Sequence, residues 1–151
     1  MEFPAVVLTS GVPSPLDQAL PGAVRLEDIP DATDEGAWVA RTAIAITAAV
    51  QQSLLTPPLL LVFAGEHARQ APHLGFAQRA ARRSVHGYVL IDPALPTPGS
   101  VSDWPDAPVT VVLSEPDTDI ERDSRLRGWE VHIGEPVDLV VDIIAGLGDL
   151  R

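Results

Sequence analysis

The fold is decided by residues 59–67, which have the sequence Leu59-Leu60-Leu61-Val62-Phe63-Ala64-Gly65-Glu66-His67. The first five are apolar, and Pro57 and Pro58 before them end a helical pattern. An apolar run of this length is typical of a central strand that is buried on both faces of a parallel sheet. We therefore expect a buried strand that ends at a turn containing Gly65.

Similar apolar runs alternate with helical patterns along the chain. This alternation predicts an α/β fold with a mostly parallel, six-stranded sheet and helices on both of its faces. The predicted strands are Ala5–Thr9, Ala23–Leu26, Leu59–Phe63, Val85–Ile91, Val109–Leu113 and Trp129–Ile133. The predicted helices are Leu16–Leu20, Trp38–Leu54 with Asp34 as a capping residue, a segment from His67 to about Arg83, and Val137–Leu147. No repeat or boundary divides residues 1–151, so one domain is expected.

Composition excludes several classes of function. The 151 residues include no cysteine, which rules out disulfides, a thiolate nucleophile and a cysteine metal site. The net charge is -11 and all ten basic residues are arginine, which argues against a nucleic-acid-binding surface. The cluster of Arg79, Arg82 and Arg83 is ascribed to a helix end, where cations suit the helix dipole.

Targeting and membrane signals are not found in the sequence. The longest apolar run, Pro57 to Gly65, has the length of a strand and not of a membrane span. The first residues lack a basic leader and lead directly into the first predicted strand. We therefore expect a cytoplasmic protein that binds neither membranes nor nucleic acid.

Polar residues gather where the predicted strands end. In parallel sheets, ligands bind outside the carboxyl ends of the strands. This edge is therefore the predicted place for a small-molecule site. The residues at or just after these ends are Ser10, Glu27, Asp28, Gly65, Glu66, His67, Asp92, Ser114, Glu115 and Asp117.

Four segments, taken in order, resemble the core of the α/β-hydrolase superfamily. Residues 10–13 (Ser-Gly-Val-Pro) stand where the family has an oxyanion loop of the His-Gly-x-Pro type. Residues 24–31 (Val-Arg-Leu-Glu-Asp-Ile-Pro-Asp) are similar to the strand end that follows in the family. Residues 85–96 (Val-His-Gly-Tyr-Val-Leu-Ile-Asp-Pro-Ala-Leu-Pro) resemble a later strand, and residues 126–131 (Leu-Arg-Gly-Trp-Glu-Val) the start of the last strand. The resemblance spans nearly the whole chain and implies a minimal α/β-hydrolase-like core.

The catalytic serine and histidine of that family are missing from the matching positions. A hydrolase has Gly-x-Ser-x-Gly at the nucleophile turn, whereas residues 63–68 are Phe-Ala-Gly-Glu-His-Ala. Depending on the alignment, either Gly65 or Glu66 takes the place of the serine. The connection Ile133-Gly134-Glu135-Pro136 leaves no room for the loop that carries the family's histidine, and His132 falls inside a predicted strand. Without nucleophile and base, the triad mechanism of ester hydrolysis has no proton path.

The chain also lacks room for the cap domain that the superfamily usually inserts after the strand ending at Asp92. Only the loop Thr97–Pro108 is available there, so the resemblance implies an open pocket that Trp38 and Trp104 would help to close. A missing cap also leaves apolar surface uncovered, which predicts a homodimer.

The remaining polar groups still suit acid–base chemistry. The candidate catalytic residues are Glu66, His67, His73 and Asp92, because a histidine near a carboxylate can act as general acid or base. The backbone amides near Gly11, Val12 and Glu66 are a candidate oxyanion hole. The candidate substrate-binding residues are Ser10, Gly11, Val12, Gly65, Trp38, Trp104 and Asp117.

No cofactor or metal is expected. The first strand is followed by Ser10-Gly11-Val12-Pro13-Ser14-Pro15, where a dinucleotide-binding loop would need Gly-x-Gly-x-x-Gly. The chain has no lysine for a P-loop, and the six-residue spacing of His67 and His73 does not suit a shared metal on one helix.

Two functional hypotheses follow from the residues and the resemblance. In the first, the chain is a non-hydrolytic enzyme of the lyase, isomerase or cyclase type, acting on a carbonyl-containing small metabolite by acid–base catalysis. In the second, it is a catalytically inactive relative of the hydrolases that binds a small molecule or a protein. The polar Glu66-His67 pair favours the first hypothesis.

Overall fold

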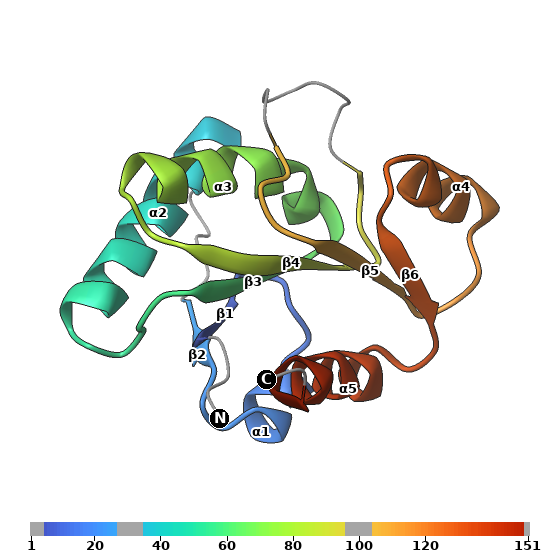
Figure 1. The fold of residues 1–151 in the computed structure, drawn as a ribbon, viewed down its shortest axis with the longest axis horizontal. Coiled ribbons are helices and arrows are strands. Elements are labelled where there is room, and N and C mark those ends of the chain that lie inside the picture. The colour runs from blue at the N-terminus through green and yellow to red at the C-terminus, as the bar shows by residue number, and fades with distance from the viewer. Residues whose placement is uncertain (1–4, 27–34, 96–103, 150–151) are drawn as a thin grey trace.

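Six parallel strands form one sheet in the computed structural model, which describes residues 5–26, 35–95 and 104–149 (Figure 1). The order across the sheet is β2-β1-β3-β4-β5-β6, and every neighbouring pair is parallel. The predicted α/β fold with a parallel six-stranded sheet is therefore confirmed. The strands are β1 (Ala5–Leu8), β2 (Val24–Arg25), β3 (Leu59–Ala64), β4 (Val85–Ile91), β5 (Val109–Leu113) and β6 (Glu130–Ile133).

Helices cover both faces of this sheet. They are α1 (Pro15–Ala19), α2 (Glu35–Gln51), α3 (Ala71–Ala80), α4 (Thr118–Leu126) and α5 (Pro136–Asp149), and a 3-10 segment, η1 (Gly65–Gln70), precedes α3. Figure 1 shows α2, α3 and α4 on one side of the sheet and α1 and α5 on the other. None of the helices within the described residues is long and apolar enough to cross a membrane.

The pattern of the strands explains why helices lie on both sides. Alternate residues of β3 enter different cores: Leu59, Leu61 and Phe63 pack on the side of α2 and α3, whereas Leu60 and Val62 pack on the side of α1 and α5. All five of these side chains are buried, as expected for a strand without polar residues. The continuous apolar run at residues 59–63 is therefore the direct cause of the three-layer arrangement.

Two elements differ from the sequence predictions. Helix α4 was not expected, because its nine residues are mostly charged and only Ser124 is buried. The segment after His67 is not one continuous α-helix, since η1 precedes α3 and the α-helix ends at Ala80. The predicted capping residue Asp34 and residues 27–31 of the family resemblance lie outside the described residues.

The strand order places a topological switch point between β1 and β3. The chain leaves β1 for β2 on one side and then returns to pair β3 with the other side of β1. The first five strands have the order 2-1-3-4-5 of flavodoxin-like sheets, in which ligands bind outside the carboxyl ends of the strands that flank the switch point. The segments after Leu8 and Ala64 therefore flank the expected binding position.

Candidate functional site

The carboxyl ends of β1 and β3 are held side by side by their pairing. Leu8 pairs with Val62, and the next residue, Thr9, donates its backbone N–H and its side-chain hydroxyl to the Val62 carbonyl at 3.1 and 2.8 Å. Ser10 and His67, which are 57 residues apart in the sequence, consequently meet just beyond the sheet. The sequence had placed both residues at strand ends, and the structure brings them together.

His67 is fixed in a single orientation by two neighbours. Its Nδ1 atom donates a hydrogen bond to the Ser10 backbone carbonyl at 2.8 Å. Its ring stacks on the indole of Trp38, with the ring centroids 4.4 Å apart and an interplanar angle of 20°. Trp38 in turn donates its indole N–H to the Ser10 hydroxyl at 2.9 Å, and both of these residues are buried. The three side chains form one interlocked unit, which we call the Ser10–Trp38–His67 cluster.

This arrangement determines which nitrogen of His67 can act on a ligand. A carbonyl oxygen only accepts hydrogen bonds, so Nδ1 must carry a proton, and the neutral ring then has its lone pair on Nε2. Within residues 5–26, 35–95 and 104–149, no group hydrogen-bonds to Nε2. The His67 side chain is half-buried and not enclosed. His67 therefore offers a free basic nitrogen at the switch point.

Ser10 is not arranged as a nucleophile for this histidine. Its hydroxyl oxygen lies 3.5 Å from His67 Nδ1, but that nitrogen is already donating to the Ser10 carbonyl. A histidine that activates a serine must instead accept the hydroxyl proton. Ser10 therefore positions His67 and Trp38, a role that its place at a strand end did not reveal.

Two glycines shape the backbone around the cluster. Gly11 has φ of +90°, and a Cβ atom built on it would lie 3.4 Å from His67 Nδ1. Gly65, at the turn from β3 into η1, has φ of +59° and open space around its Cβ position. Such φ values strain most other residues. Of the two residues that the sequence offered for the nucleophile position, Gly65 is thus the one with the left-handed turn conformation.

Val12 and Glu66, the other two residues of the predicted oxyanion hole, already make contacts within the chain. The Val12 amide donates to the Thr9 carbonyl at 3.3 Å, and the Val12 side chain is buried in the core beside α1 and α5. The Glu66 side chain is 76% exposed and pairs with Arg69 at 3.0 Å, one helical turn away. The Glu66 carboxylate is therefore a solvated surface group, although its backbone follows Gly65 directly.

Asp92 ties two strand ends together. Its Oδ1 atom accepts hydrogen bonds from the Ser114 amide at 2.8 Å and from the Ser114 hydroxyl at 3.1 Å. Asp92 has φ of +43°, and two residues later the Ala94 amide donates to the Gly65 carbonyl at 3.0 Å. Asp92 thus fixes the loop next to Gly65, and among the described residues it makes no hydrogen bond or ion pair with His67.

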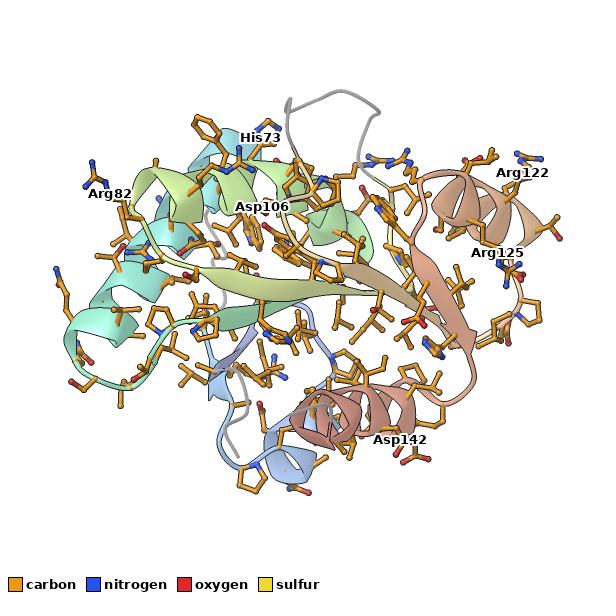
Figure 2. All side chains as sticks on the ribbon, in the orientation of Figure 1. His73, Arg82, Asp106, Arg122, Arg125 and Asp142 are labelled. Carbon is orange, nitrogen blue, oxygen red and sulfur yellow. The ribbon has the colours of Figure 1, made fainter. Side chains whose placement is uncertain are left out.

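Three predicted site residues belong to other parts of the molecule. His73 is exposed on the outer side of α3 (Figure 2). Asp117 is the N-cap of α4, where its carboxylate accepts the Ile120 amide at 3.1 Å. Trp104 packs edge-on against Tyr88 and Trp129, with centroid distances of 5.2 and 5.6 Å. The structure groups none of these three with the Ser10–Trp38–His67 cluster.

A polar network that starts at the buried Tyr88 and reaches the surface near Trp104 was not predicted from the sequence. Tyr88 donates its hydroxyl to Asp106 Oδ1 at 2.9 Å, and Arg79 pairs with the other carboxylate oxygen at 3.5 Å. Burial raises the pKa of Tyr88 well above its usual value of 10, and the hydrogen bond to Asp106 and its negative charge raise it further. The only sequence feature that could have indicated this network is Tyr88, a residue with a polar hydroxyl inside a mostly apolar predicted strand. This network joins β4, α3 and the segment before β5.

Metal ligation has no support in the described part of the chain, where no group of three or more His, Asp or Glu side chains is close enough to hold an ion. Comparison of the chain with family models, with curated protein sequences and with solved structures gives no match.

Proposed function

We propose that the chain is a non-hydrolytic enzyme with an α/β-hydrolase-like core, in which His67 is the general acid–base acting on a carbonyl-containing small metabolite. The observation that carries this proposal is the fixed His67 ring, whose Nδ1 is bound to the Ser10 carbonyl at the switch point. A general base needs a free lone pair, a fixed direction and access to a ligand. Ser10 and Trp38 hold the His67 ring, its Nε2 has no hydrogen-bond partner among the described residues, and its side chain is half-buried, which together support this role.

The geometry also favours acid–base chemistry over covalent catalysis. Gly65 has no side chain to attack a substrate, and the chain has no cysteine. The connection from β6 to α5 consists of Gly134 and Glu135 alone, so it carries no histidine. His132 lies within β6, 3.7 Å from Glu130. Acid–base catalysis requires neither a nucleophilic side chain nor the histidine that the family carries after its last strand.

In the proposed reaction, His67 Nε2 removes a proton from the substrate next to its carbonyl group. In an isomerisation, the proton then returns to another atom of the substrate. In an elimination, it passes to the leaving group, whose bond to carbon breaks as the double bond forms. In a ring closure, the carbon that lost the proton forms the ring bond to a second carbonyl carbon, whose oxygen takes the proton. The positive charge that forms on the imidazole is stabilised by the Ser10 carbonyl and by the face of the Trp38 indole, the latter by about 1 kcal/mol. In this proposal the backbone amide of Glu66, which follows Gly65, polarises the carbonyl.

A second candidate function is ligand binding without turnover. It is favoured by one observation: among the described residues, no carboxylate forms a hydrogen bond or ion pair with His67, and Asp92 instead accepts two hydrogen bonds from Ser114. In that case His67 Nε2 would form one hydrogen bond with the ligand, and no proton would move.

The two functions are separated by a metabolite screen with three proteins: the wild type, His67→Gln and Glu66→Gln. Glutamine keeps a group that can donate to the Ser10 carbonyl but cannot serve as a base. Each protein is incubated with a metabolite extract of the native host, and the products are followed by mass spectrometry. A metabolite converted by the wild type and by Glu66→Gln, but not by His67→Gln, supports the proposal. A metabolite that co-purifies unchanged with all three proteins supports the binding function.

A further inference from the structure

The outer face of α2 and α3 differs from the rest of the molecule in charge. Residues 36–91 contain five arginines and a single acidic residue, Glu66. The rest of the chain contains five arginines and twenty acidic residues. The net charge is +4 for residues 36–91 and -15 for the rest of the chain, so two copies repel each other less strongly through the layer built by α2 and α3 than through their acidic surfaces.

This face is also unusually apolar for a solvent-exposed surface. Five large apolar side chains of the described residues are exposed, and three of them lie on α2, on α3 or just after α2. These three are Ile44, Phe76 and Leu54. The outward stripe of α2 continues with Ala40, Thr47 and Ala48, and after Glu35 at its first position the only charged residue of α2 is Arg41. An exposed helix normally carries charged residues on its outer face.

A groove runs between the two helices beside Ile44. Its volume is about 330 Å³, and its walls are mainly small side chains from both helices, with Arg83 at one end. We call it the α2–α3 groove, and its small lining residues are Ala43, Thr47, Ala48, Ala77 and Ala81. Ile44, 68% exposed, forms part of the same wall. A protruding apolar side chain and a groove that can receive one thus lie next to each other.

We propose that this face binds a second copy of the chain, with α2 packed antiparallel against α2 of the other copy around a twofold axis near Ile44. Ile44 lies one residue from the middle of the 17-residue helix, so a twofold there aligns the two helices over their full length. Each Ile44 enters the α2–α3 groove of the other copy, and Ala40 meets Ala48, which allows a close approach.

The position of Arg41 suits this antiparallel arrangement. Arg41 of each copy lies opposite Thr47 and near the C-terminal end of the other α2, where the helix dipole is negative. A 17-residue helix is about 25 Å long and two packed helices are about 20 Å wide, which gives roughly 500 Å² of face per copy. This is below the ~800 Å² per partner of a standard interface. We therefore expect a dimer that dissociates on dilution.

The test is the mass of the intact protein in solution, measured by sedimentation velocity from low micromolar to near-millimolar concentration. The wild type should shift from 16.0 kDa to twice that mass as the concentration rises. Ile44→Glu should weaken the dimer at least about 30-fold, as expected when a central contact is lost. Leu126→Glu changes a residue that is 80% exposed on α4, and this control should leave the dimer unchanged.

A second measurement does not depend on the Ile44→Glu protein. Because the chain has no cysteine, Ile44→Cys introduces a unique thiol next to the proposed axis. A short bismaleimide should link two copies of this variant, but not two copies of Leu126→Cys. A wild type that keeps the single-chain mass at all concentrations would overturn the proposal, and so would equal linking of the two variants. The α2–α3 groove would then be left for a partner of different chemistry.

Discussion

The Nδ1 atom of His67 lies 2.8 Å from the carbonyl oxygen of Ser10 and donates a hydrogen bond to it. This one bond connects the segments that follow β1 and β3, the two strands on either side of the switch point. It also fixes the tautomer of the ring and leaves the lone pair on Nε2. The proposed acid–base role of His67 depends on this bond more than on any other contact of the site.

Replacing Ser10 by alanine should reduce stability. The Ser10 hydroxyl accepts the Trp38 indole N–H at 2.9 Å in a buried position, so its loss leaves that donor unsatisfied. We expect a decrease of about 1–3 kcal/mol in the free energy of unfolding, measured with urea. In a Trp38→Phe background the same change should cost at least about 1 kcal/mol less. Equal costs in both backgrounds would show that the bond does not contribute.

Replacing Gly11 by alanine should disturb His67. The φ of +90° strains alanine by about 1–3 kcal/mol, and the new methyl group would lie 3.4 Å from the ring nitrogen. The free energy of unfolding should fall, and the NMR resonances of the His67 ring should shift. Gly22→Ala is the control, because nothing lies within 4 Å of its Cβ position. If the two variants show the same free energy of unfolding and the same His67 resonances, the close approach of Gly11 does not determine the position of the His67 ring.

Replacing Gly75 by alanine should destabilise the protein. A Cβ atom there would collide with the Tyr88 hydroxyl and lie 2.9 Å from the Trp104 indole nitrogen. Overpacking of this kind costs about 1–3 kcal/mol. Gly146→Ala in α5 has open space around the new methyl group and should stabilise the helix by about 0.5–1 kcal/mol. Thermal unfolding of the two variants should therefore move in opposite directions from the wild type.

Tyr88 should make stability depend on pH in the alkaline range. Its pKa is raised on folding, so the folded state keeps its proton above pH 10 while the unfolded state releases it. The stabilising contribution is complete below pH 10 and decreases above it, with a slope approaching about 1.4 kcal/mol per pH unit.

The Tyr88 effect can be measured without interference from other side chains. Tyr88 is the only tyrosine, and the chain has no lysine or cysteine, so no other side chain is expected to titrate between about pH 9 and 11. Tyr88→Phe should be less stable at neutral pH, because Asp106 loses its donor, but its stability should not fall across this range. A parallel decrease in both proteins would contradict the assignment.

Much of the fold could be predicted because strand burial is visible in the sequence. The boundaries of β4 and β5 agree with the predicted Val85–Ile91 and Val109–Leu113, since both strands are mostly apolar and end abruptly at polar residues. Helix α4 was missed because most of its residues are charged. Its one buried residue is Ser124, so the sequence shows no regular spacing of apolar residues there. Asp117 followed by acidic residues was the available signal, and it was interpreted as part of a binding site.

The positions of Ser10 and His67 at strand ends could be predicted from the sequence, but the contacts that they make could not. A parallel sheet brings strand ends together, so Ser10 and His67 could be placed near each other from the sequence. The stacking of Trp38 on His67 depends on how α2 packs against the sheet, which no local pattern encodes. Trp38 was therefore expected to close a pocket, whereas the structure places it, buried, against the His67 ring.

The central claim is that His67 moves protons on a carbonyl compound, and it is tested most directly by deuterium exchange in a metabolite extract of the native host. The extract is incubated in D₂O with the wild type, His67→Gln or Glu66→Gln, and metabolite masses are compared. We predict that at least one metabolite gains deuterium or is converted with the wild type and with Glu66→Gln, but remains unchanged with His67→Gln. No exchange or conversion with the wild type, or equal exchange with His67→Gln, would contradict the account.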